Sequence, residues 1–179
     1  AVEYVFDRAE KFQMLGAGKE ISTVDNAADG ILLLQRVIRR RPAREREVRL
    51  MLVWHGGNQS GIAVSSIDPA GGVHADPSSW NYNLGNIRTR PFSQIWTSNS
   101  DPRLVALRAN PRPIKGRCSS CSFLGMCNGN LRARAEGYFA DFLAPDPACY
   151  LTDAEIGVKP GTREERASAE WPVPVHRGA

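Results

Sequence analysis

The spacing of its four cysteines constrains this 179-residue chain more than any other feature of the sequence. They read C-x2-C-x5-C-x21-C, with three in "KGRCSSCSFLGMCNGN", residues 115–130, and the fourth in "APDPACYLTDAEIG", residues 144–157. Two thiolates two residues apart can bind one metal centre because the backbone between them turns tightly, and a third five residues later can close a face. A distant fourth thiolate would bring another segment to the same centre. The candidate metal ligands are Cys118, Cys121, Cys127 and Cys149.

Several chemistries compete for such a cysteine set. Structural zinc favours two paired CxxC-like turns, whereas only the first pair here has that form. An iron–sulfur cluster tolerates irregular spacing because its four irons offer separated corners, and "DPAC" places a proline close to the last cysteine, as ferredoxin-type loops do. Disulfides are disfavoured by the reducing compartment that we expect, and unligated core cysteines are the remaining alternative. The spacing favours a cluster over zinc and leaves both open.

The composition suits a globular core and argues against several classes of protein. Hydrophobic residues make up 42% of the chain, enough for one domain or a domain with a piece of another. The sequence shows no signal peptide and no apolar run of roughly 18–20 residues, so we expect a cytoplasmic protein without a membrane partner. The 23 Lys and Arg against 19 Asp and Glu are dispersed, which argues against nucleic acid. In "RRRPARERE" the alternating charges indicate a solvated helix face.

Residues 1–55 are predicted to be mostly helical and to resemble the end of a larger α/β domain. Apolar residues recur at three- and four-residue steps in "AVEYVFDRAEKFQMLG", residues 1–16, which indicates an amphipathic helix. A short strand is expected at 21–24, followed by a helix over 27–41. Pro42 interrupts that helix before another over 43–54. The glycines of "HGGNQSG" then mark a boundary.

Residues 56–157 are predicted to form a small unit of strands and short helices. "GIAVSSID" and "GVHAD", joined by the turn "PAGG", predict a hairpin, and "NYNLGNI" predicts another turn. Short helices are expected in "RPFSQIW" and in "SDPRLVALRAN", the latter capped by Ser100 or Asp101. Residues 158–179 are polar, rich in proline and expected to be disordered. The expected fold class is α+β.

Three stretches resemble a known family. "GNIRTRPFSQIW", the cysteine loop and "DPACYLTDAEIG" resemble the SPASM-type auxiliary-cluster domain at the C-terminus of radical S-adenosylmethionine (radical SAM) enzymes. "EISTVDNAADG", "WHGGNQSGIAVSSIDPAGGVHADPSSWNYNLGNI" and "CSSCSFLGMCNGNLRARAEG" narrow the likeness to the radical SAM enzymes of haem d1 biosynthesis and of the alternative haem pathway. The resemblance runs from about Ala1 to Gly157.

This resemblance implies an auxiliary [4Fe–4S] cluster on the four cysteines and the last part of a radical SAM partial barrel in residues 1–55. It implies that the complete enzyme uses S-adenosylmethionine, a second [4Fe–4S] cluster and a reduced electron donor such as ferredoxin or flavodoxin. That enzyme would remove propionates from a sirohaem-derived tetrapyrrole. The sequence departs from the family in lacking the CxxxCxxC motif that holds the second cluster, so we expect this C-terminal portion to be inactive alone. Alternatives are a radical SAM maturase acting on a peptide and a non-catalytic zinc-binding interaction module.

Other polar residues are candidates for binding roles. Asp25 and Asn26 follow the expected strand and could contact S-adenosylmethionine, or could cap the next helix. Asn58, Ser60 and His74 could meet substrate, although an interdomain turn and a structural histidine are the plainer interpretations. Basic side chains could bind propionates or tune a cluster, or could simply be surface charges: Arg88, Arg90, Arg132 and Arg134 for the first role, Lys115 and Arg117 for the second.

Overall fold

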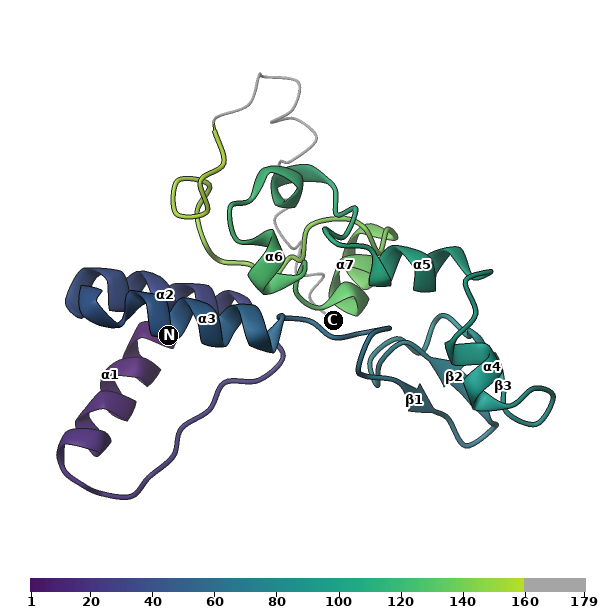
Figure 1. Cartoon of the computed structure of the whole chain (residues 1–179), viewed down its shortest axis with the longest axis horizontal. Helices are drawn as coiled ribbons and strands as arrows, with labels where there is room; N and C mark the ends of the chain where they lie inside the picture. The colour runs from purple at the N-terminus through teal and green to yellow at the C-terminus, as the bar shows by residue number, and fades with distance from the viewer. Residues whose placement is uncertain (160–179) are drawn as a thin grey trace, which may run out of the picture.

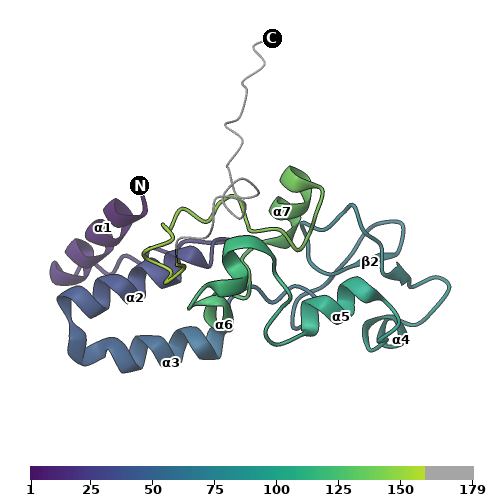
Figure 2. The ribbon, with the colours of Figure 1, turned by 90° about the horizontal axis from the view of Figure 1, so that it is seen from above.

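The computed structural model describes residues 1–159 and contains helices and one small antiparallel sheet, in agreement with the α+β prediction. A group of helices lies at one end of the molecule and the sheet at the other, with the cysteine-bearing segments between them (Figures 1 and 2). No helix in this described part is long and apolar enough to cross a membrane. In chain order the elements are α1 Val2–Met14, α2 Ala28–Arg40, η1 Pro42–Arg44, α3 Glu45–His55, β1 Ser66–Ile67, β2 Gly72–His74, β3 Gly85–Asn86, α4 Phe92–Trp96, α5 Pro102–Arg108, η2 Gly116–Ser120, α6 Leu124–Cys127 and α7 Arg132–Phe139.

The N-terminal helices form where the sequence predicts them, including the break at Pro42, but the strand predicted at 21–24 is wrong. That stretch is irregular and exposed, and Val24 keeps 78% of its surface accessible. A strand needs a neighbour to pair its backbone groups, and no other strand lies in this block of the described chain. The partial barrel implied by the resemblance is therefore not seen, and the predicted tail over 158–179 lies almost wholly outside the described residues.

A buried arginine joins the first two helices. Arg36 of α2 is 6% exposed, and its guanidinium forms ion pairs with Glu3 at 2.7 Å, Asp7 at 2.5 Å and Glu10 at 2.8 Å. The three carboxylates share one face of α1 because they lie four and three residues apart. The hydrogen bonds from Arg36 hold the pKa of Asp7 and of Glu10 below their usual values. These pairs keep α1 against α2.

The sheet is the hairpin predicted from the sequence, extended by a third strand. β2 lies in the middle and pairs antiparallel with β1 and with β3. One core packs the sheet against α4 and α5, and Asp101 caps α5 by accepting the backbone N–H of Leu104 at 2.9 Å. The buried residues of this core are Val73, Ala75, Leu84, Ile95, Leu104 and Leu107.

A second core joins the N-terminal helices to the cysteine segments. Its buried members are Ala28, Ile31 and Leu32 of α2 together with Leu151 and Ile156 near the end of the described chain. Partly buried residues of the cysteine loop and of its surroundings pack on it, including Cys121, Phe123, Met126 and Cys149. The predicted units 1–55 and 56–157 thus share this core.

His74 closes the hairpin through a buried ion pair. Its ring is 3% exposed; Nε2 lies 3.0 Å from Oδ2 of Asp68, and Nδ1 lies 2.9 Å from the carbonyl oxygen of Tyr82. Both ring nitrogens therefore face acceptors, an arrangement that the doubly protonated imidazolium satisfies. Burial by itself lowers the pKa of His74, but the hydrogen bond to Asp68 and those to backbone carbonyls raise it to a net value above the ordinary one.

This pair predicts a pH-dependent stability. Because the pKa of His74 is raised in the fold, its contribution is complete below its ordinary pKa of about 6.5 and is lost as the pH rises through the raised value. The hydrogen bond from His74 lowers the pKa of Asp68, so the carboxylate contributes fully above about pH 4. We expect the thermal unfolding midpoint to decrease as the pH rises from about 6 to about 8. His74→Gln should remove most of that decrease.

A matched control is His55→Gln, which alters an exposed histidine at the end of α3. It should leave the pH dependence of the unfolding midpoint as it is in the unmodified chain. If His74→Gln kept the wild-type slope between the two pH values, the charged pair would not be present in the fold.

Candidate metal centre

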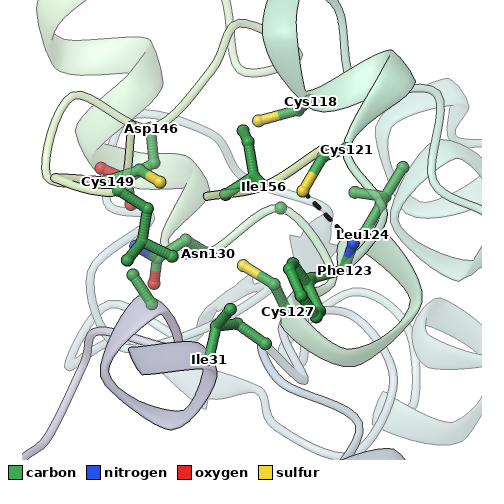
Figure 3. A pocket seen from close by; sticks show the side chains of 13 residues that line it. Ile31, Cys118, Cys121, Phe123, Leu124, Cys127, Asn130, Asp146, Cys149 and Ile156 are labelled. Atoms are coloured by element: carbon green, nitrogen blue, oxygen red, sulfur yellow. Dashed lines mark hydrogen bonds between the residues drawn. The ribbon is translucent and has the colours of Figure 1, made fainter. Parts of the chain in front are cut away.

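The four cysteines predicted as ligands line one pocket. Cys118 lies in η2, Cys121 directly follows it, Cys127 ends α6 and Cys149 lies in the loop after α7. Figure 3 shows these four side chains around a common space, with their sulfur atoms facing the space between them. None of them forms a disulfide. The apolar part of the wall is formed by Ala28, Ile31, Phe123, Leu124, Leu151 and Ile156.

The loop folds tightly for local reasons. The backbone N–H of Cys121 donates to the carbonyl oxygen of Cys118 at 3.2 Å, and the N–H of Phe123 donates to the sulfur of Cys121 at 3.4 Å. The last helical turn ends at Asn128, whose φ of +56° is a left-handed conformation that asparagine tolerates. This turn redirects the chain directly after Cys127.

Burial keeps the four thiols protonated in the absence of a metal. Removal from water raises the pKa of Cys118 to about 11 and that of Cys127 to about 12, and it also raises the pKa of Cys121 and of Cys149. For Cys127 the charges of the other three cysteines add to this rise. Since metals bind thiolates, metal binding here must displace protons.

The donor set fits a thiolate-bound metal group. Among residues 1–159, no three side chains of His, Cys, Asp or Glu are grouped so as to hold a single metal ion. The fit therefore rests on the pocket and not on a ready-made site for one ion: four sulfur donors from two segments of the chain line the same pocket, within apolar walls. Thiolate is the ligand type that iron–sulfur clusters and structural zinc share.

The glycine pair of "HGGNQSG" lies directly against the cysteine loop. A Cβ atom on Gly57 would lie 2.2 Å from the carbonyl oxygen of Cys127, which is a steric clash. Only glycine, which has no Cβ, fits at this position. The backbone N–H of Asn58 donates to the same oxygen at 3.1 Å. The side chain of Asn128 returns a hydrogen bond to the carbonyl of Asn58 at 2.8 Å, and Arg112 donates to Oδ1 of Asn58 at 2.8 Å. Asn58, considered for substrate binding from the sequence, here braces the loop.

The other candidates for substrate contact are interior residues in this structure. Ser60 is 2% exposed, and its carbonyl oxygen accepts Nη2 of Arg112 at 2.7 Å. His74 has both ring nitrogens engaged within the hairpin. Neither side chain is presented to solvent.

Asn26 connects the start of α2 with the cysteine segments. Its Oδ1 accepts the N–H of Ala28 at 3.3 Å and the side-chain amide of Asn130 at 2.7 Å. Its Nδ2 donates to the carbonyl of Ala148, the neighbour of Cys149, at 3.4 Å. The cap position of α2 is occupied by Ala27, and Asn26, one residue before it, accepts an N–H of the first turn and ties α2 to the cysteine segments.

Asp25 and the arginines of α7 occupy different surroundings. Asp25 is exposed, with a φ of +57°, and its carbonyl oxygen accepts Arg134 at 2.7 Å. Arg134 also pairs with the buried carboxylate of Asp146 at 2.9 Å. Arg132 is buried, and Arg88 is exposed. Exposed Arg88 therefore stays a candidate for binding a substrate carboxylate, whereas Arg132 and Arg134 use their guanidinium groups inside the protein.

The two cations proposed to tune a cluster differ in position. Lys115 is exposed and pairs with Asp141 at 2.6 Å. Arg117 pairs with Asp153 at 2.9 Å and donates to the carbonyl oxygens of Cys149 and Leu151, so it holds the Cys149 segment against the loop. Sequence reasoning missed the wall residues of α2 and the buried Arg112, since apolar periodicity does not show which element a helix face will meet.

Comparison with known proteins agrees with the cysteine chemistry. Residues 63–122 match the SPASM family model, an iron–sulfur cluster-binding domain; this stretch includes Cys118 and Cys121 and ends before Cys127. No solved structure gives a significant match.

Curated relatives belong to haem pathways. The chain is 42% identical over 160 residues to the Fe-coproporphyrin III synthase of Methanosarcina barkeri, covering 88% of this chain and 40% of that protein. It is 42% identical over 159 residues to the pre-heme d1 synthase of Dinoroseobacter shibae, covering 88% of this chain and 39% of that protein. The AdoMet-dependent heme synthase of M. barkeri is 37% identical over 65 residues, 36% of this chain and 18% of that one. The chain spans about two fifths of the first two relatives, and its resemblance to radical SAM enzymes of haem biosynthesis is confirmed.

The contact between Gly57 and Cys127 predicts a site-specific cost of adding one methyl group. Gly57→Ala places a Cβ against the Cys127 carbonyl oxygen at a φ of +64°, whereas Gly18→Ala adds the same group at +61° with no atom within 4 Å. Left-handed strain costs both variants roughly 1–2 kcal/mol. Overpacking should cost Gly57→Ala about 1–3 kcal/mol more and lower its metal content.

Chemical denaturation and metal analysis of the two variants measure this difference. Equal unfolding free energies and equal metal contents for Gly57→Ala and Gly18→Ala would show that the close approach to Cys127 does not support the loop.

Proposed function

We propose that this chain is the auxiliary-cluster portion of a radical SAM enzyme that removes propionate side chains from a sirohaem-derived tetrapyrrole in haem d1 formation. The observation that carries the proposal is the pocket lined by the four thiols of Cys118, Cys121, Cys127 and Cys149, two of which lie in the matched cluster-binding domain. The names of the relatives support a tetrapyrrole substrate. The first refers to Fe-coproporphyrin III, the second to pre-heme d1 and the third to heme.

The four cysteines would hold a [4Fe–4S] cluster. When bound, this group supplies one-electron redox chemistry, with each iron corner held by a cysteine of the chain. The apolar wall of the pocket keeps water from the thiolates, and the braced loop fixes their positions. We assign the site an electron-transfer role, because four protein ligands leave no open iron position for substrate.

The remaining chemistry belongs to other parts of the complete enzyme. Generation of a radical from S-adenosylmethionine needs a second cluster on a CxxxCxxC motif, and the proposed auxiliary site would use all four cysteines of this sequence. We therefore expect this chain by itself not to cleave S-adenosylmethionine. A low-potential carrier such as ferredoxin or flavodoxin would supply electrons to the complete enzyme.

The metal content tests the auxiliary site. Purified without oxygen, the chain should contain about four irons and four acid-labile sulfides, with a brown charge-transfer band. Cys127→Ser should lower iron content and the unfolding midpoint because it removes a buried ligand. Ser120→Ala, an exposed change beside Cys121, is the matched control. One zinc per colourless chain would instead support the non-catalytic zinc module.

The substrate is tested with the complete enzyme. Supplied with S-adenosylmethionine, reductant and a sirohaem-derived tetrapyrrole, it should yield a product whose mass reflects loss of propionate side chains. Cys121→Ser in that enzyme should abolish most of the turnover while S-adenosylmethionine is still cleaved. Absence of any change in the tetrapyrrole with both clusters present would contradict the assigned substrate, and modification of a peptide would support the maturase.

A further inference from the structure

Two arginine side chains are buried close to the cysteine pocket. Arg112 and Arg132 are each 2% exposed. Neither guanidinium is within ion-pair distance of a carboxylate in the part of the chain that the structure describes. A guanidinium keeps its charge at neutral pH, and a buried charge is costly unless an opposite charge compensates it. Each of these two cations therefore depends on hydrogen bonds and on charges beyond ion-pair distance, such as Asp76 for Arg112 and Asp146 for Arg132.

Arg112 uses all three of its nitrogens in hydrogen bonds to oxygen. Nε donates to the carbonyl of Leu107 at 2.6 Å, and Nη2 donates to that of Ser60 at 2.7 Å. Nη1 donates to Asn58 at 2.8 Å and to the carbonyl of Asn128 at 3.0 Å. These hydrogen bonds connect Asn58 and Ser60 with Leu107 and Asn128, so the role of Arg112 is to brace the cysteine loop.

Arg132 is different because one of its nitrogens has no acceptor in the described part of the chain. Nη1 donates to the carbonyl oxygens of Ala144 at 2.6 Å and Phe142 at 3.0 Å, and Nε lies 3.5 Å from that of Asn130. Nη2 is fully buried and has no hydrogen-bond partner among residues 1–159. Buried donors in proteins are nearly always satisfied, so an acceptor is expected beside this one.

The anionic groups that can act on Arg132 are the carboxylate of Asp146 and, once a metal has displaced their protons, the thiolates of the cysteine pocket. Gly129 lines the cysteine pocket, and a Cβ atom there would lie 3.4 Å from Cζ of Arg132, so the guanidinium lies behind this part of the wall. Burial lowers the pKa of Arg132, and the charge of Cys118 opposes this most strongly, followed by Asp146 and Cys127. In turn, burial raises the pKa of Cys118, and the charge of Arg132 is the strongest influence that lowers it.

We propose that Arg132 is the counter-cation of the four-cysteine site and a positioning residue that raises the reduction potential of the bound cluster. The inference rests on the proposed auxiliary cluster. Four thiolates and an oxidised [4Fe–4S] core carry a net charge of −2, and one electron from a low-potential reductant makes it −3. A nearby buried cation stabilises the more negative state, and Nη2 supplies an N–H donor for sulfur.

The test compares the cluster's midpoint potential in variants of the anaerobically prepared chain, by redox titration followed by EPR. Arg132→Met should shift the potential to a more negative value, and Arg132→Lys, which keeps the charge, should shift it less. Arg88→Met removes the same charge from an exposed residue and should leave the potential unchanged, because solvent screens it. A potential in Arg132→Met equal to that of the wild type would overturn the inference.

Iron and sulfide analysis of the wild type separates this failure from failure of the proposed function. A wild-type chain without a cluster contradicts the auxiliary site itself. A wild-type chain with a full cluster and an Arg132→Met potential that does not move contradicts the role of Arg132 alone. Loss of the cluster from folded Arg132→Met, with retention in Arg132→Lys, supports the counter-cation.

A second measurement needs no substitution at Arg132, in case the variants do not fold. In a chain labelled with 15N only at arginine, pulsed EPR of the reduced cluster should detect a 15N coupling. The nitrogens of Arg112 are all hydrogen-bonded to oxygen. In the described chain Nε of Arg117 and Nη2 of Arg132 have no hydrogen-bond partner, and Nε of Arg117 lies 2.9 Å from Asp153. The coupling should therefore persist in Arg117→Lys, which leaves Nη2 of Arg132 as the donor. A spectrum without 15N coupling would overturn the assignment.

Discussion

The structure depends on the convergence of four thiols on one apolar pocket. Burial raises the pKa of every cysteine there, and the charges of neighbouring cysteines add to the rise for Cys118, Cys121 and Cys127, so a metal group that binds must displace the protons. Backbone contacts hold the arrangement from outside, above all the approach of Gly57 to the carbonyl of Cys127. Metal binding and folding of this segment should therefore be one event.

The electrostatics of the surroundings follow from the same constraint. Arg117, partly exposed and paired with Asp153, fastens the Cys149 segment by hydrogen bonds to backbone carbonyls. Arg132 lies in the interior with an unused donor, where low polarisability of the medium makes a charge act more strongly on the thiols. Of two cations near the same cysteines, the buried one is thus suited to tuning and the exposed one to fastening.

The site lies within the core that joins the N-terminal helices to the cysteine segments. Ala28 and Ile31, from the block before the predicted boundary, line the pocket together with Leu151 and Ile156 from the end of the described chain. The other core, which packs the sheet on α4 and α5, is closed separately by the charged pair of His74 and Asp68. The helical block is therefore part of the cluster site, in addition to any role it has in a larger domain.

The sequence by itself determined the helices and the hairpin, because apolar periodicity, Pro42 and the "PAGG" turn act locally, and it identified the four cysteines through their spacing. Only the tertiary structure decided what depends on distant neighbours. Residues 21–24 have strand-forming side chains but no strand to pair with. Asn58 and His74 have the chemistry of binding residues, but their polar atoms are used by partners that local pattern does not reveal. Arg132 reads as a surface charge in a polar helix, and burial beside thiols gives it a different role, since desolvation is a property of the fold.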